Sequence, residues 1–357
     1  MNLNDLSLIR LANQRVSASD FRTPGEIVGW MGAMQAQDYN MSKWAIGIRL
    51  PGCTVNETEA AFDSGEIIRM HLLRPTWHLV ASEDVHWMLE LCGQRIRASM
   101  KARDHQLGLT VDIFKKSNKL LEKTLGGGKH LTREELIREF RHAGINTEEN
   151  RASHLLMHAE THGIICSGKI KAGKPSYTML HEWVPKSGTM NKEEALATLA
   201  ERYFSSHGPA TAEDFIWWSG LTAGDGKKAL EMVKSNFSST VVEDKIFWYR
   251  DHSSEMSDQP ITASLIPAFD ELIISYKDRQ AVLPDENHSK AVYTNGIFRP
   301  VILLNGRVVG IWKQTVKKEH LTVTAELFDP TDENVKESLR KAAIPLGIFT
   351  NKKISVV

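Results

Sequence analysis

The chain of 357 residues carries 44 Lys or Arg and 44 Asp or Glu side chains, so its formal net charge at pH 7 is zero. This length is long for one domain and suits two to four small ones. No basic and apolar leader opens the sequence and no apolar stretch reaches the length of a bilayer span, so we expect a cytoplasmic protein without membrane contacts. Cys53, Cys92 and Cys166 lie far apart without a Cys-x-x-Cys pair, which argues against a disulfide framework or a cysteine-based zinc site.

The first predicted unit covers residues 1–81 and contains the most informative residues of the chain. Hydrophobic spacing predicts helices near residues 5–16, 24–35, 42–49 and 55–64, and strands near 67–71 and 76–80. The second of these helices begins at Thr23 and Pro24 and ends in two polar residues, Gln35 and Gln37. Packing alone explains neither glutamine, so the pair is either a solvated helix end or a functional site.

Residues 82–125 are predicted to form connecting helices, with Ser82 capping a helix that runs to about His105. Basic charge gathers in this region and beyond it. Residues 95–180 hold 16 basic and 9 acidic side chains, a net charge of +7, whereas both flanking segments are net acidic. This excess indicates either a basic face on an otherwise neutral protein or a set of solvated helix faces that bind nothing.

The clearest repeat of the helix-and-strand pattern lies in residues 126–185. Thr132 and Glu135 fit a capping box for one helix, and a second helix from Arg151 to His162 precedes two short strands. Residues 186–255 show the same order, with three helices and then a hairpin at 238–250. Helices followed by a strand pair are the outline of a winged helix, so we predict three tandem winged-helix units.

From residue 256 to the C-terminus the pattern becomes mostly β. Asn305-Gly306 between two apolar runs is the strongest hairpin signal of the chain. A further strand at 320–328 and a helix at 332–343 indicate a small barrel or half-barrel with one helix packed on it. The predicted fold class is therefore α+β, with three winged-helix units followed by a C-terminal β-barrel-like domain at 256–357.

Several short motifs, in this order and spacing, resemble a known family. They are Met34–Asp38, His71–Val80, Leu265–Asp270, Asp278-Arg279, Phe298–Pro300 and Gly306–Trp312. No single motif is specific. Together they span nearly the whole chain and resemble the tandem winged-helix DNA glycosylases, the AlkZ/YcaQ-like proteins.

The resemblance implies a C-shaped molecule whose concave basic cleft takes duplex DNA, and a catalytic Gln-x-Gln motif at Gln35 and Gln37. In that family the second polar position is Gln or Asp, and Gln37 matches the form associated with unhooking of interstrand crosslinks. We therefore expect a DNA repair hydrolase whose partner is double-stranded DNA carrying alkylated purines. We also expect a monomer that needs no cofactor or metal and is associated with the nucleoid.

The chemistry of the two glutamines agrees with such a substrate. A neutral amide cannot act as a general base at pH 7, so the pair is of no use against an ordinary nucleoside bond. Alkylation at purine N7 makes the base cationic and a good leaving group. Gln37 can then hold the attacking water while Gln35 orients that water or the sugar. Nothing in the sequence requires a lysine Schiff base, so we expect a monofunctional glycosylase that leaves an abasic site.

Asp38, Arg74, Thr76 and His78 are secondary candidates for the site. Asp38 is a competing candidate for the base, with a salt bridge at a helix terminus as its structural alternative. The other three alternate along a predicted strand, where they either line the cleft or form a buried structural network.

Basic and polar side chains of the middle segment are the candidates for DNA contacts. They are Lys101, Arg103, Lys115, Lys116, Lys129, Arg133, Arg151 and Ser153. His154, His158 and His162 share one face of a predicted helix at a spacing that can bind a metal, but no fourth ligand is evident. We interpret this face as a phosphate or groove contact instead.

Two other functions remain open from the sequence. Winged helices most often belong to non-enzymatic DNA-binding proteins or regulators, although no ligand-sensing domain or dimerisation helix is evident here. A protein-interaction scaffold without DNA contacts is compatible with the net charge of zero. Release of a modified base distinguishes the enzyme from both alternatives.

Overall fold

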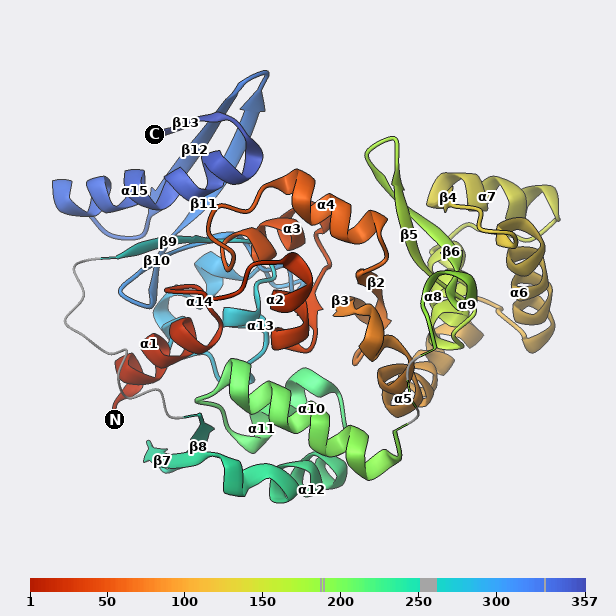
Figure 1. The fold of residues 1–357 in the computed structure, drawn as a ribbon, viewed down its shortest axis with the longest axis horizontal. Coiled ribbons are helices and arrows are strands. Elements are labelled where there is room, and N and C mark those ends of the chain that lie inside the picture. Colours follow the sequence, from red (N-terminus) through yellow and green to blue (C-terminus); the bar gives the residue numbers. More distant parts are fainter. Residues whose placement is uncertain (187, 189, 251–261, 331) are drawn as a thin grey trace. The chain divides into compact units, whose positions relative to one another are not determined.

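The computed structural model describes residues 1–186, 188, 190–250, 262–330 and 332–357 (Figure 1). It is a mixed α+β structure whose contacts divide the chain into two compact units. The larger unit comprises Met1–Thr58, Ala197–Trp218 and Thr222–Val357. The smaller unit comprises Glu59–Leu196 and Ser219–Leu221.

The N-terminal and central parts of the larger unit are mainly helical. Their elements are α1 (Leu3–Asn13), α2 (Pro24–Met31), β1 (Met34–Gln35), α3 (Tyr39–Gly47), α10 (Lys192–His207, which begins in the smaller unit), α11 (Ala212–Ser219), α12 (Ala223–Val233), η2 (Lys234–Asn236), and the antiparallel pair β7 (Ser238–Val242) and β8 (Lys245–Tyr249). Thr23 caps α2 through a capping box with Glu26, as the sequence predicts for this helix start.

A curled half-barrel sheet forms the C-terminal part of the larger unit, in the strand order β13-β12-β11-β10-β9. Its elements are β9 (Ala263–Ile266), α13 (Glu271–Ile274), α14 (Asp285–Ala291), β10 (Val301–Leu304), β11 (Arg307–Lys317), β12 (His320–Leu327), α15 (Glu333–Thr350) and β13 (Lys353–Val356). Only β12 and β13 run parallel. The predicted half-barrel sheet is present, but among the described residues three helices of this segment, α13, α14 and α15, pack on it instead of the one expected.

Alternation along the central strands explains why this sheet is buried on both faces. On β10, Val301 and Leu303 pack in one core with residues of α1, α13 and α14, while Ile302 packs in the other with residues of α3 and α15. Asn305 and Gly306 form the predicted turn between β10 and β11, both with positive φ. The sheet therefore connects α13 rigidly to the hydrophobic core.

The smaller unit contains the helix-and-hairpin pattern that the sequence predicts for residues 126–185. Its elements are α4 (Val55–Asp63, which begins in the larger unit), β2 (Ile67–Leu72), β3 (Thr76–Ala81), η1 (Ser82–Asp84), α5 (Val85–Gln106), α6 (Val111–Leu125), β4 (Leu131–Thr132), α7 (Arg133–His142), α8 (Arg151–Thr161), β5 (Ile165–Lys171), β6 (Lys174–Met179) and α9 (Leu180–Trp183). Its core includes Leu121, Phe140, Leu155 and Tyr177. Assignment of these elements as winged helices stays a prediction.

Three helix boundaries differ from those expected. α2 ends at Met31, because Gly32 adopts a φ of 72° that stops the helix one turn before the glutamines. The helix after β3 is preceded by the 3₁₀ turn η1, and no side-chain cap from Ser82 begins it. α15 continues through Pro345 to Thr350, because its apolar face packs on the sheet and outweighs the local penalty of proline.

The five predicted segments, 1–81, 82–125, 126–185, 186–255 and 256–357, remain a prediction about domain organisation. The expected boundary at residue 255 lies outside the described residues. Within the part of the chain that the structure describes, no helix combines the length and the apolar character needed to cross a membrane.

The turn at Gly306 allows a direct test of the packing between the sheet and α1. Gly306→Ala places a Cβ against Ser7 Oγ at a φ of 82°, whereas Gly296→Ala meets open space at a φ of 78°. We expect Gly296→Ala to lower the free energy of unfolding by about 1 kcal/mol through backbone strain alone. We expect Gly306→Ala to lower the free energy of unfolding by a further ~1–3 kcal/mol through overpacking. Chemical denaturation of both variants measures these losses. Equal losses in the two variants contradict this packing.

Candidate functional site

Gln35 and Gln37 lie in the short extended connection between α2 and α3, and the predicted position at the end of a helix is wrong. Gly32 ends α2, and Gln35 then lies in the two-residue strand β1. The Gln35 side chain is only 5% exposed, whereas Gln37 is exposed at a bend. A solvated helix end therefore does not account for Gln35, whose environment is fixed by the fold.

Asp38 caps the next helix, α3. Its Oδ1 accepts hydrogen bonds from the backbone N–H groups of Asn40 and Met41, both at 3.0 Å. The carboxylate thus satisfies the first turn of α3, a role different from the predicted salt bridge. A carboxylate held in this way is a poor candidate for the catalytic base.

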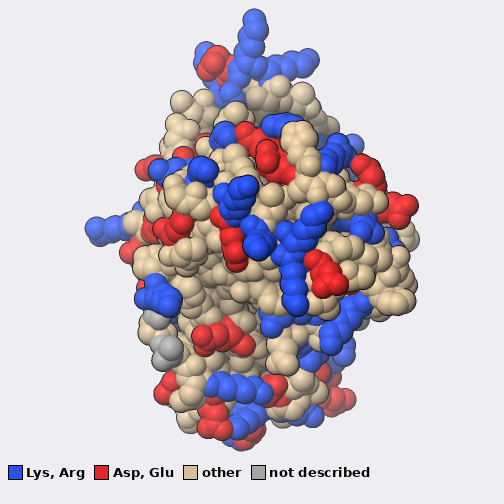
Figure 2. Space-filling view, turned by 90° about the vertical axis from the view of Figure 1, so that its right-hand side faces the viewer, with Lys and Arg blue, Asp and Glu red and all other residues tan. Residues whose placement is uncertain are grey.

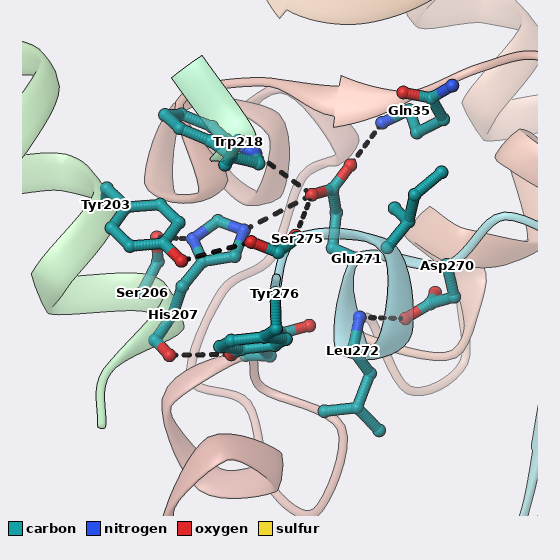
Figure 3. Close-up of polar contacts among 12 residues, drawn as sticks. Gln35, Tyr203, Ser206, His207, Trp218, Asp270, Glu271, Leu272, Ser275 and Tyr276 are labelled. Atoms are coloured by element: carbon teal, nitrogen blue, oxygen red, sulfur yellow. Dashed lines mark hydrogen bonds and ion pairs between the residues drawn. The ribbon is translucent and has the colours of Figure 1, made fainter. Parts of the chain in front are cut away.

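A buried carboxylate from a distant part of the chain accepts a hydrogen bond from the backbone of the Gln-x-Gln motif. The N–H of Gln35 donates to Oε1 of Glu271, which is 1% exposed and is the first residue of α13 (Figure 3). Oε2 of Glu271 accepts from Trp218 Nε1 at 3.0 Å and from Ser275 Oγ. Nε2 of His207 lies 3.5 Å from the same oxygen. Both carboxylate oxygens are therefore occupied.

The Glu271 carboxyl is ionised because the groups that face it favour its charged form more than burial disfavours that form. Burial raises the pKa of Glu271, but His207, Ser275 and the Gln35 N–H hold it below its usual range. Burial also lowers the pKa of His207, against the opposing effect of Glu271. Nε2 of His207 faces the carboxylate, while Nδ1 lies 2.8 Å from Ser206 Oγ, whose own hydroxyl donates to the carbonyl oxygen of Arg202 at 2.7 Å.

A second layer of buried polar groups holds α13 in place. Asp270, immediately before Glu271, forms a two-point ion pair with Arg49, in which both N–O distances are 2.8 Å. Arg49 also donates to Gln14 Oε1 at 2.8 Å, and Gln14 donates to the Tyr276 hydroxyl at 3.0 Å. These residues come from the turns after α1 and α3 and from the segment around α13, so the network joins distant parts of the larger unit.

Sequence reasoning missed Glu271 and His207 as parts of the site. Glu271 follows a motif that resembles the family, but an isolated acidic residue there carries no sign of a partner at Gln35. His207 is a lone histidine at the end of α10.

Arg74, Thr76 and His78 do not alternate along one strand as expected. Leu73, at a φ of 53°, begins the turn between β2 and β3, and this turn contains Arg74. Only Thr76 and His78 share β3. The His78 ring is fully buried, with Nδ1 at 2.9 Å from the Thr76 carbonyl oxygen, which supports the structural alternative for this residue.

The candidates for DNA contact fall into two groups. Lys101, Arg103, Lys115, Lys116 and Lys129 are exposed. Figure 2 shows the face on the side of α6 and α7, where basic side chains gather with acidic ones among them. Arg133 donates to Ser153 Oγ at 2.9 Å, and Arg151 donates to the carbonyl oxygens of Leu107 and Asn146. The side chains of the second group, Arg133, Arg151 and Ser153, are therefore hydrogen-bonded within the smaller unit.

His154 and His158 of α8 and His162 just after it do not all converge on one point, although the His158 and His162 ring centroids lie 4.0 Å apart. Nδ1 of His154 lies 2.6 Å from Asp104 Oδ1, while His158 stacks on Phe114 with ring centroids 3.8 Å apart. Burial lowers the pKa of His158 to about 4, so this ring is neutral at pH 7. Among the described residues, no group of three or more His, Cys, Asp or Glu side chains is arranged to hold a metal ion.

Comparisons with known proteins identify a family and a solved structure of similar fold. A family model described as DNA glycosylase AlkZ-like matches residues 28–349. An interstrand DNA cross-link repair glycosylase from Streptomyces sahachiroi is 23% identical over 351 residues, covering 94% of this chain and 92% of the relative. The solved structure of Streptomyces sahachiroi DNA glycosylase AlkZ covers all of both chains with a TM-score of 0.78 at 20% identity. The last likeness establishes the fold.

The ion pair between Arg49 and Asp270 is expected to dominate the stability of the network. Arg49→Met leaves Asp270 buried and unpaired, and should cost about 3–5 kcal/mol of unfolding free energy. The control Arg340→Met removes an exposed partner of Glu333 and should leave the free energy of unfolding almost unchanged. Adding Asp270→Asn to Arg49→Met should cost much less than Asp270→Asn does alone. Strict additivity in chemical denaturation contradicts a coupled buried pair.

Proposed function

This protein belongs to the AlkZ-like DNA glycosylase family, and we propose that it hydrolyses the N-glycosidic bond of N7-alkylated purines in duplex DNA, including bulky adducts or interstrand crosslinks. The family model covers most of the chain, so the protein is a DNA repair enzyme. The observation that carries the substrate proposal is the neutral character of the motif. Its two polar side chains are amides, and the adjacent Asp38 caps α3.

Neutral amides suit a reaction in which the leaving group is already charged. An N7-alkylated purine departs with the electrons of the bond between its nitrogen and C1′, and this neutralises its positive charge. Water then adds to C1′ of the oxocarbenium-like sugar and loses a proton to solvent. The enzyme must place the water and face the developing positive charge with amide oxygens, which requires no strong base.

The different exposure of the two glutamines supports different roles for them. Gln37 is exposed at its bend, so its amide can reach a water molecule and the sugar at the surface. Gln35 is buried and its backbone N–H is held by Glu271, so its amide is the fixed member of the pair. We assign Gln37 to holding the water and Gln35 to orienting the water or the sugar.

Among reactions on N7-alkylated purines, we propose the unhooking of crosslinks as the activity of this enzyme. Gln37 gives the motif its Gln-x-Gln form, and the curated relative is a cross-link repair glycosylase. Extrusion of a base into a tight pocket is not available to a base tethered to the opposite strand. A surface site built around an exposed amide suits such a substrate better.

We extend the proposal to DNA binding and product. The exposed lysines and Arg103 of α5, α6 and the following loop contact backbone phosphates of the duplex. The enzyme is monofunctional, acts as a monomer without a cofactor, and leaves an abasic site. The alternative of a non-enzymatic DNA-binding protein predicts binding to the same duplex without release of any base.

Substitutions in the motif test this function directly. We expect purified wild-type protein to release N7-methylguanine from duplex DNA and to unhook a nitrogen-mustard crosslink, giving sites that alkali cleaves. Gln37→Ala should slow single-turnover release about 10²-fold or more, because the water loses its position. Duplex affinity, measured at the same salt concentration, should stay within about twofold of wild type since few phosphate contacts change.

Asp38→Asn is the matched control for this experiment. It removes the charge of the competing base, but its amide oxygen can still cap α3. We expect near wild-type release from this variant. Normal turnover by the Gln35→Ala/Gln37→Ala double variant, or loss of turnover only in Asp38→Asn, overturns the assignment. Borohydride trapping of a covalent DNA complex by the wild type contradicts the monofunctional mechanism.

A further inference from the structure

We propose that Glu271 is a positioning residue for the reaction, acting through the backbone N–H of Gln35. This inference rests on the function proposed above and goes beyond the two glutamines. Glu271 does not touch substrate, since its carboxylate is 1% exposed and both its oxygens are occupied within the protein. Its effect on catalysis is to fix where the Gln-x-Gln segment lies.

The segment that carries the glutamines has little secondary structure of its own. α2 stops at Gly32, β1 is two residues long, and a bend at Gln37 follows before α3 begins. A stretch of this kind needs tertiary contacts to hold one conformation. The hydrogen bond from Gln35 to Glu271 supplies such a contact at the buried glutamine itself, from a residue 236 positions away.

The carboxylate is in turn held from several sides. Trp218 and Ser275 donate to Oε2, and Asp270 accepts from the N–H of Leu272 at 2.9 Å, which caps the four-residue helix α13. The pair between Asp270 and Arg49 anchors that cap in the core. Rigid support of this kind is what a group must have if it is to fix a catalytic segment within a fraction of an ångström.

A glutamine at position 271 cannot replace the glutamate. A carboxylate offers two acceptors, and here one faces the N–H of Gln35 while the other faces the N–H of Trp218. An amide offers one acceptor and one donor, so one of these N–H groups would face another donor. Hydrogen bonds to an ionised acceptor are also about twice as strong as neutral ones. Glu271→Gln therefore releases Gln35 or disturbs Trp218.

Three variants separate positioning from a general structural role. Glu271→Gln removes the charge and Glu271→Asp keeps it but shortens the reach towards Gln35, while the control Glu333→Gln removes the charge of an exposed glutamate outside this network. We expect the first two to slow single-turnover release of N7-methylguanine about 10²-fold, the scale of a 1 Å misplacement. Duplex affinity should stay within about twofold, and Glu333→Gln should keep its release rate within about threefold.

Hydrogen exchange at the Gln35 amide gives a readout that does not depend on activity. Exchange should accelerate in Glu271→Gln and Glu271→Asp and remain slow in the wild type and in Glu333→Gln. Faster exchange with a slowed release rate supports the proposal. A folded Glu271→Gln variant with wild-type release overturns it, and so does a slowed variant whose Gln35 amide remains protected.

Different results would contradict the positioning role of Glu271 and the proposed glycosylase function. If the wild type releases no base from any N7-alkylated duplex, the function is wrong, whereas release that is insensitive to residue 271 removes only the positioning role. If neither Glu271 variant folds, an amide-to-ester substitution at residue 35 decides the question. That change deletes only the donor, so a slowed release supports positioning and an unchanged rate overturns it.

Discussion

The buried carboxylates of Asp270 and Glu271 are the constraint on which the arrangement of the larger unit depends. One is paired with Arg49 in the turn after α3, and the other accepts from Gln35 and Trp218. Burying two adjacent charges is costly unless every lone pair is satisfied. The fold meets this requirement by bringing α1, α3, β1, α10 and α11 to α13. The groups that satisfy these carboxylates thereby fix the segment that carries the glutamines.

Local features of the structure could be predicted because their signals lie within a few residues. The Thr23 cap of α2, the capping box of α7 and the Asn305-Gly306 turn are all formed as the sequence predicts. The end of α2 was misjudged, because apolar residues at helical spacing continue past Gly32, where the backbone turns. Glycine at this position was the available signal.

The support of the site could not be predicted, because its contacts join residues far apart in the chain. Gln35 and Glu271 are separated by 236 positions, and Arg49 and Asp270 by 221. Nothing in the local sequence of Glu271 distinguishes it from a surface glutamate. The same limit applies to Arg151, which the sequence suggested for DNA contact and whose guanidinium instead bonds two backbone carbonyls.

The proposed site of two neutral amides limits the substrates of the enzyme, because such a site can position water but supplies little base catalysis. The most direct test compares N7-methylguanine with its ring-opened, uncharged derivative in the same duplex, under single-turnover conditions with wild-type protein. The account predicts rapid release of the cationic base and little release of the neutral one. Equal rates for the two bases would contradict it.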